Sequence, residues 1–214
     1  MLRCSTSLWS ADLANLESDI KRVEPYSDRF HLDIADGHYV PNLLFFPDQV
    51  KAIRRCTHLP FEAHLMVTDP MFWLEPFIEA GVDRFIICHD SVAEPQSVLR
   101  AIRERGKHTG MSLLITEPIE LVVPYLDQLD SVLIIGTAMG IKGATMDAGV
   151  PAKIRRIREA INERGLNVEI ISDGGIRRET APLIAKAGAD FIVPGSLMFK
   201  EDPAAMRDWL AGLP

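Results

Sequence analysis

Short apolar runs alternate along the chain with amphipathic stretches. The runs are rich in Ile, Val, Leu and Phe and are bounded by turn residues. This is typical of strands in a parallel sheet whose two faces are both covered. Eight such runs occur, at residues 2–7, 29–34, 61–66, 84–88, 111–115, 131–136, 168–172 and 190–194. The pattern therefore predicts an alternating α/β fold.

Helical patterns lie between most of these runs. Leu13, Leu16, Ile20 and Val23 recur at a spacing of three or four residues, which is typical of the buried face of a helix. Glycines placed just before the next strand are expected to end several helices. These glycines are Gly81, Gly106, Gly165 and Gly188.

Two Asp-Pro pairs indicate where helices begin. Asp69 and Asp202 are each followed by a proline, and this order pairs a helix-capping side chain with a residue suited to the first turn. Both pairs precede amphipathic stretches. We therefore expect a helix to start at each of them.

The number and spacing of the units predict the architecture. The chain has 214 residues, so eight units take roughly 27 residues each, enough for a strand, two loops and a helix. This favours a closed (β/α)8 TIM barrel in a single domain over residues 1–214. An open doubly wound sheet is the alternative, weakened because no GxGxxG follows the first run.

Composition and charge narrow the class of partner. Apolar residues make up 47% of the chain, and the net charge is −7, which argues against nucleic acid and anionic membranes as partners. No apolar run approaches the roughly 18–20 residues that span a bilayer.

The three cysteines indicate the redox environment. Cys4, Cys56 and Cys88 are widely spaced and odd in number, so we expect free thiols and a cytoplasmic location.

Polar residues fall where several of the predicted strands end. His31 and Asp33 share a face of the second strand, His64 lies near the end of the third, and Asp173 ends the seventh. In a barrel these ends form the site of chemistry. Two histidines and two aspartates suit Zn²⁺, Mn²⁺, Fe²⁺ or Co²⁺. The pattern alone leaves two interpretations open: a metal or acid–base site, or hydrogen-bonded residues of the core and loops.

Glycine-containing loops follow the last two predicted strands. Gly174 and Gly175 come after the seventh strand, and Gly195 and Ser196 come after the eighth. Glycines there let backbone N–H groups approach an anion at the start of a helix. Barrels often bind a phosphate at these two loops. The sequence thus favours a phosphorylated ligand.

Several stretches together resemble one known family, the ribulose-phosphate 3-epimerases. The most specific is His31-Leu-Asp-Ile-Ala-Asp-Gly-His-Tyr-Val-Pro-Asn42. The other stretches are Ser7-Leu-Trp-Ser-Ala-Asp-Leu13, His64-Leu-Met-Val-Thr-Asp-Pro70, Asp173-Gly-Gly175 and Gly195-Ser196. They are spread over nearly the whole chain in the order found in that family.

The resemblance implies a barrel of the ribulose-phosphate-binding type and an isomerase activity. The implied reaction is inversion of carbon 3 of a ketose phosphate through an enediolate, with D-ribulose 5-phosphate as the default substrate. It also implies that Asp33 and Asp173 are the acid–base pair, and that Ser10 touches the substrate. The implied ligands of one divalent metal are His31, Asp33, His64 and Asp173. The implied phosphate contacts are Gly174, Gly175, Gly195 and Ser196.

The chain departs from this family in the loop after the sixth predicted strand. The family pattern Asn/Asp/Glu-Pro-Gly-Phe-x-Gly-Gln is replaced by Ala138-Met-Gly-Ile-Lys-Gly-Ala144, which keeps Gly140 and Gly143 as candidate substrate contacts. Lys142 is a new candidate anion contact. The family also packs methionines around the reacting carbon. Here Met66 keeps one, while Ala35 and Ile135 stand where two others are expected.

The altered loop keeps several functions open. The same chemistry on a hexulose 6-phosphate, a tetrulose phosphate or a branched pentulose phosphate is the first alternative. A related decarboxylase or lyase that stabilises an enediolate is the second, and a non-catalytic sugar-phosphate binder is the third. The paired aspartates argue against the last. Because the family includes dimers and hexamers, we also expect a homo-oligomer.

Overall fold

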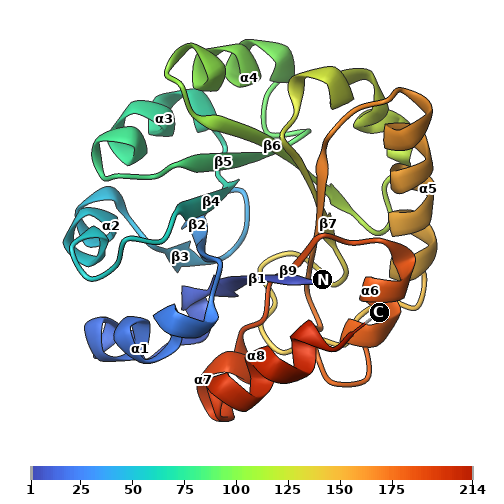
Figure 1. Cartoon of the computed structure of the whole chain (residues 1–214). Coiled ribbons are helices and arrows are strands. Elements are labelled where there is room, and N and C mark those ends of the chain that lie inside the picture. The colour runs from blue at the N-terminus through green and yellow to red at the C-terminus, as the bar shows by residue number, and fades with distance from the viewer. Residues whose placement is uncertain (1, 214) are drawn as a thin grey trace.

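Eight parallel strands close into a central barrel in the computed structural model, which describes residues 2–213 (Figure 1). Consecutive strands pair with one another, and β1 pairs with both β2 and β9, so the sheet closes. The barrel strands are β1 (Arg3–Ser7), β2 (Arg29–Asp36), β4 (Phe61–Met66), β5 (Arg84–Cys88), β6 (His108–Leu114), β7 (Ser131–Ile135), β8 (Glu169–Asp173) and β9 (Phe191–Ile192). The predicted TIM barrel is confirmed.

Helices surround this barrel (Figure 1). The α-helices are α1 (Leu16–Val23), α2 (Pro47–Arg54), α3 (Pro70–Glu79), α4 (Pro95–Glu104), α5 (Val150–Glu163), α6 (Ala181–Ala187), α7 (Ser196–Lys200) and α8 (Pro203–Ala211). The 3-10 helices are η1 (Leu8–Ser10), η2 (Glu24–Tyr26), η3 (Ile119–Leu121) and η4 (Val123–Gln128). Within residues 2–213 we find no helix with the length and apolar character needed to cross a bilayer.

The structure departs from the predicted regular alternation in two places. Between β6 and β7, the 3-10 helices η3 and η4 stand in place of an α-helix, and Pro124 in the first turn of η4 cannot donate to a helix continuing from η3. A short strand, β3 (Leu43–Leu44), pairs antiparallel with the end of β2 through Ala35 and Asp36. Two residues are too few to give a recognisable pattern.

The predicted helix ends are largely confirmed. Asp69 caps α3 by accepting a hydrogen bond from the N–H of Phe72 at 3.0 Å, and Asp202 caps α8 by accepting from Ala204 at 3.2 Å. The four expected glycines all have positive φ angles just beyond helices. One prediction is wrong: Leu13 precedes α1, which starts at Leu16, and its side chain is about half exposed.

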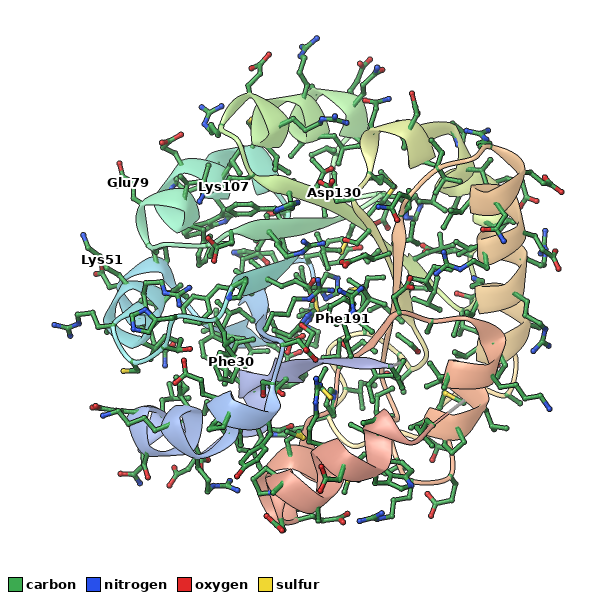
Figure 2. All side chains as sticks on the ribbon, in the orientation of Figure 1. Phe30, Lys51, Glu79, Lys107, Asp130 and Phe191 are labelled. Atoms are coloured by element: carbon green, nitrogen blue, oxygen red, sulfur yellow. The ribbon has the colours of Figure 1, made fainter. Side chains whose placement is uncertain are left out.

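The strands divide their side chains between two environments, because successive residues point to opposite faces. On β2, Phe30, Leu32 and Ile34 belong to the apolar layer beneath the helices. The alternate residues, Arg29 and His31 among them, point into the barrel interior and are also buried. Figure 2 shows Phe30 and Phe191 within the molecule, whereas Lys51 and Glu79 on the outer helices point away from it.

Aspartates join neighbouring strands in pairs at the N-terminal end of the barrel. Each stands just before one strand and exchanges two hydrogen bonds with a residue of the preceding strand. Its carboxylate accepts from the backbone N–H, and its own N–H donates to the carbonyl. The pairs are Asp28 with Cys4, Asp83 with Phe61, Asp130 with Thr109 and Asp190 with Ile170, with carboxylate distances of 2.7, 2.9, 2.8 and 2.7 Å.

We predict that Asp190→Ala lowers the free energy of unfolding by about 1–3 kcal/mol, because the buried N–H of Ile170 loses its acceptor. Urea denaturation followed by circular dichroism measures this loss. Asp190→Asn is the control, since its amide oxygen still accepts that hydrogen bond although its ion pair with Arg158 is lost. An alanine variant as stable as the asparagine variant would contradict the role of this hydrogen bond.

Candidate active site

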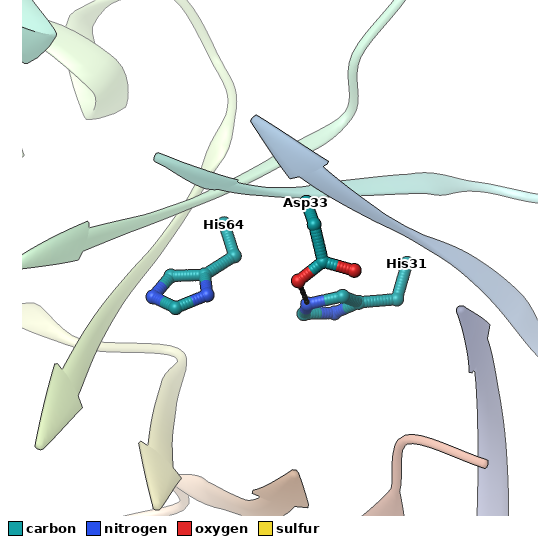
Figure 3. Close-up of side chains that lie close together, drawn as sticks. All are labelled: His31, Asp33 and His64. Carbon is teal, nitrogen blue, oxygen red and sulfur yellow. Dashed lines mark ion pairs between the residues drawn. The ribbon is translucent and has the colours of Figure 1, made fainter. Parts of the chain in front are cut away.

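The predicted polar residues converge at one end of the barrel. All eight barrel strands are parallel, so their C-terminal ends meet at the same mouth. His31 and Asp33 come from β2, His64 from β4, and Asp173 ends β8. Figure 3 shows His31, Asp33 and His64 directed toward one another. The closed sheet thus gathers residues that are far apart along the chain.

Three of these residues form a tight cluster of possible metal ligands. One ligand atom from each of His31, Asp33 and His64 lies within 4.8 Å of the others. The Nε2 atom of His31 is 3.6 Å from Oδ1 of Asp33 (Figure 3). Among the described residues, His31 Nε2 and His64 Nδ1 have no hydrogen-bond partner although they are buried. Unpaired buried nitrogens facing a carboxylate fit a divalent cation.

The remaining polar atoms of the cluster are held by neighbours. His31 Nδ1 lies 3.0 Å from a carboxylate oxygen of Glu62, and His64 Nε2 lies 3.6 Å from the Cys88 sulfur. The hydroxyl of Ser7 donates to Oδ2 of Asp33 at 3.0 Å. Each ring therefore has one nitrogen engaged and the other turned toward the cluster, the arrangement expected of histidine ligands.

Asp173 lies in the same cavity but outside the tight cluster. Its Oδ1 atom accepts a hydrogen bond from the N–H of Gly174 at 2.6 Å, which turns that oxygen toward its own loop. The four predicted ligands are thus brought to one mouth as three clustered side chains and a fourth beside them.

Burial and charge set the protonation of the β2 pair. Burial alone lowers the pKa of His31, but the negative charge of Asp33 near Nε2, together with the hydrogen bond and charge of Glu62 at Nδ1, raises it to about 10. Burial raises the pKa of Asp33, but the adjacent His31 and His64 hold it below its ordinary value. The environment of Asp33 therefore favours positive charge beside it, which a divalent cation would also supply.

The two aspartates have opposite tendencies. Burial and then the negative charge of Asp33 raise the pKa of Asp173 to about 7. Burial and then the charge of His31 lower the pKa of His64 to about 4, so that this ring is neutral. Asp33 therefore ionises more readily than a free aspartate, and Asp173 holds its proton to higher pH. Such divergence is typical of an acid–base pair.

A cavity of about 310 Å³ opens above these residues. All of the substrate contacts implied by the sequence line it. They are Ser10, His64, Met66, Gly140, Lys142, Gly143, Gly174, Gly175, Gly195 and Ser196.

Two glycines of the cavity lie where neighbouring loops approach each other closely. A Cβ atom at Gly175 would lie 2.3 Å from the backbone nitrogen of Met146, and one at Gly195 would lie 2.2 Å from the hydroxyl of Ser10.

The altered loop, residues 136–149 between β7 and α5, covers this cavity. The Lys142 ammonium donates to the carbonyl oxygen of Trp9 at 2.7 Å and lies 5.7 Å from the centre of its ring. A Cβ atom at Gly140 would lie 2.6 Å from the side-chain oxygen of Asn42. Met139 packs against the cluster formed by Ala35, Val40, Met66 and Cys88. The loop thus contacts segments that follow both β1 and β2.

Three further residues contact the site or line its cavity without having been predicted from the sequence. Glu62 contacts His31, Ser7 contacts Asp33, and Met139 adds an apolar side chain to the cavity wall. A signal for Glu62 was present, because it stands two residues before His64 on the same inward face of β4. No comparable spacing connects Met139 with β2, since its contact depends on the course of the loop.

The molecule is a (β/α)8 barrel with a cluster of histidine and carboxylate side chains at the C-terminal mouth of its strands. Residues 3–199 match the sequence model described as "Ribulose-phosphate 3 epimerase family". The chain is 34% identical over 201 residues to the ribulose-phosphate 3-epimerase of Bacillus subtilis strain 168, covering 93% of each chain. It is 37% identical over 194 residues to that of Treponema pallidum strain Nichols, covering 90% of this chain and 89% of the other. The chain belongs to the ribulose-phosphate 3-epimerase family, whose enzymes are isomerases.

Solved structures with the same fold are more distant in sequence. A mutant tryptophan synthase α-subunit from Pyrococcus furiosus superposes with a TM-score of 0.70 at 16% identity, covering 99% of this chain and 96% of the other. A 3-hexulose-6-phosphate synthase gives a TM-score of 0.68 at 17% identity, covering 98% and 97%. At this level of identity the similarity supports the fold alone.

We predict that the metal-free protein loses stability relative to its Asp173→Asn variant as the pH rises. The raised pKa of Asp173 means that the folded state keeps a proton that the unfolded chain releases. This contribution is fully present below about pH 4 and is lost toward about pH 7, at about 1.4 kcal/mol per pH unit. Urea unfolding of both proteins across this range, after chelator treatment, measures the difference. Parallel stability curves would contradict the raised pKa.

Proposed function

We propose that the protein is a metal-dependent epimerase that inverts carbon 3 of a ketose phosphate. The default reaction converts D-ribulose 5-phosphate into D-xylulose 5-phosphate. The observation that carries this proposal is the pair Asp33 and Asp173, which come from β2 and β8 and line one cavity beside the histidine cluster. Inversion without other chemistry needs one group to remove a proton and another to supply one on the opposite face.

The protonation of the pair suggests the order of events. Asp33 is ionised, so it accepts the proton from carbon 3 of one epimer. Asp173 supplies a proton on the opposite face of the resulting enediolate. The roles reverse for the other epimer. Because the two carboxylates influence each other, their titration belongs to the pair rather than to either residue.

One divalent ion, Zn²⁺, Mn²⁺, Fe²⁺ or Co²⁺, completes the proposed site. Its ligands would be His31 Nε2, His64 Nδ1, Asp33 and Asp173, since both nitrogens are buried and unpaired among the described residues. When bound, such an ion supplies positive charge that stabilises the negative oxygens of an enediolate. Ser7 holds Asp33 in place through its hydroxyl hydrogen bond.

The substrate is proposed to lie with its phosphate over the loops that follow β8 and β9. Gly174, Gly175, Gly195 and Ser196 all line the cavity there, and none of the glycines places a side chain over its backbone. Ser10 faces the same space. A cavity of about 310 Å³ is at the lower limit of the usual range for small-molecule sites, which suits a compact sugar phosphate.

The default substrate is tested by proton NMR of the metal-loaded protein in D₂O with D-ribulose 5-phosphate. Entry of deuterium at carbon 3 together with formation of D-xylulose 5-phosphate supports the proposal. A metal-loaded protein that gives neither result rejects this substrate. Loss of a carbon atom from any substrate tried would instead favour a decarboxylase or lyase.

A second candidate is the same chemistry on another sugar phosphate. Met139 of loop 136–149 packs beside Met66 and Ala35, so an apolar side chain from this loop contributes to a wall where β2 supplies only a small alanine. This arrangement favours a substrate whose carbon skeleton differs from that of D-ribulose 5-phosphate near the reacting carbon. The same NMR assay with tetrulose, hexulose and branched pentulose phosphates distinguishes these substrates by their rates of deuterium entry.

A homo-oligomer is also proposed. Among residues 2–213, five large apolar side chains are more than half exposed, and two of them, Leu43 and Phe46, line the same surface pocket. The other three are Phe72, Ile141 and Leu183. Exposed apolar area of this kind is typical of surfaces that bind another protein. Light scattering during gel filtration reports the mass, and a monomer at all concentrations would reject the proposal.

We predict that Asp33→Asn and Asp173→Asn each lower kcat by at least about 10²–10⁴-fold, because each removes one of the two groups that exchange protons with carbon 3. Steady-state kinetics on the substrate identified by NMR measures the loss, and circular dichroism checks that the fold is retained. Full activity in either folded variant would reject the two-base mechanism.

Lys142→Ala is expected to raise KM for the sugar phosphate by about tenfold, since one charge-assisted contact contributes roughly 1.5 kcal/mol. The physical basis is the ammonium group held over the cavity by the Trp9 carbonyl. Lys51→Ala is the control, because that lysine lies on α2, points away from the molecule and does not line the cavity (Figure 2), and its KM should be unchanged. An unchanged KM for Lys142→Ala would remove the anion contact.

A further inference from the structure

Glu62 lies inside the barrel directly beneath the cluster and is fully buried. Its two carboxylate oxygens have different partners. Oε1 lies 3.0 Å from His31 Nδ1 and accepts a hydrogen bond from the hydroxyl of Ser5 at 2.8 Å. Oε2 faces the guanidinium groups of Arg29 and Arg84, at 2.9 and 3.6 Å. One carboxylate thus joins a candidate metal ligand to a pair of arginines.

The arginines are held from the other side by a second carboxylate. Glu169 Oε2 lies 2.9 Å from Arg29 Nη1 and 2.8 Å from Arg84 Nη2, so the two glutamates and two arginines form a ring of ion pairs. The guanidinium of Arg29 also stacks over Phe191, 3.5 Å from the ring centre. The ring therefore has two carboxylates that share Arg29 and Arg84. Glu169 also pairs with Arg3 at 3.0 Å, whereas Glu62 alone contacts His31.

We propose that Glu62 is a positioning residue for the metal centre. By accepting the Nδ1–H of His31 it fixes the rotation of the imidazole, so that Nε2 faces Asp33 and His64. A metal-binding histidine is commonly oriented by a carboxylate on its other nitrogen, and loss of that carboxylate weakens metal binding. The inference rests on the metal of the proposed function and adds a residue outside the ligand set.

The arginine ring explains how a carboxylate can perform this role inside a barrel. A buried unpaired carboxylate would be strongly unfavourable. Arg29 and Arg84 balance the charge at Oε2, which leaves Oε1 free to orient His31. The hydrogen bond from Ser5 restrains the same oxygen. Both carboxylate oxygens of Glu62 are therefore restrained, Oε2 by the arginines and Oε1 by Ser5, and Oε1 in turn orients His31.

Glu62→Gln and Glu169→Gln form a matched pair of variants. Each removes one negative charge from the same two arginines, but the second leaves the partner of His31 in place. Co²⁺ is titrated into chelator-treated protein, and both the dissociation constant and the visible d–d absorption are recorded. We expect Glu62→Gln to bind Co²⁺ about 10–100-fold more weakly, with an altered spectrum. Glu169→Gln should keep the wild-type affinity and spectrum, even if its melting temperature falls.

Glu62→Asp separates geometry from charge and serves if the glutamine variant does not fold. It keeps the negative charge that the arginines require but withdraws the oxygen from Nδ1 by one methylene. We expect it to fold and still bind Co²⁺ more weakly than the wild type. A wild-type affinity in a folded Glu62 variant, or an equal loss in Glu169→Gln, overturns the inference. Failure of the wild type itself to bind Co²⁺ or Zn²⁺ would instead reject the proposed metal.

Discussion

Every inward-facing polar side chain of this barrel must find a partner, because the interior excludes water. The period of two along a strand sends Arg29, His31 and Asp33 into the same narrow space. An unpaired charge there would cost far more than any single packing contact contributes. The structure meets this constraint with a continuous set of pairs, from the arginines at one end to the aspartates at the other. The cluster at the mouth is the upper end of that set.

The pairing also explains why the mouth carries so much chemistry. Below His31 each charged group lies beside an opposite charge, although Glu62 Oε2, Arg29 Nη2 and Arg84 Nε make no hydrogen bond. At the mouth, His31 Nε2 and His64 Nδ1 also lack hydrogen-bond partners among the described residues, and no arginine lies beside them. Unpaired polar atoms at a cavity favour binding of a cation or a substrate. The lower and upper parts of the interior therefore use the same kinds of side chain, and they differ in whether arginines or an open cavity lie beside the carboxylates.

Much of the fold was predictable from the sequence, because apolar strands and capped helices leave local patterns. The eight barrel strands and the caps at Asp69 and Asp202 depend on such local signals. The exceptions have local causes. Leu13 fits a helical spacing but precedes the helix, and β3 is too short to give a pattern. Of the site, residues on strand ends were predictable, but Met139 was not, because loop 136–149 has no period that fixes where its side chains lie.

The exchange of hydrogen bonds by Asp28, Asp83, Asp130 and Asp190 occurs once for every two strands. It links β1 to β2, β4 to β5, β6 to β7, and β8 to β9. The barrel thus has eight strands but only four of these aspartate connections, one for each pair of strands. A fourfold arrangement of this kind treats the strand pair as the modular unit. Loops at the opposite end can diverge in length and composition without disturbing the joints that hold these modules together.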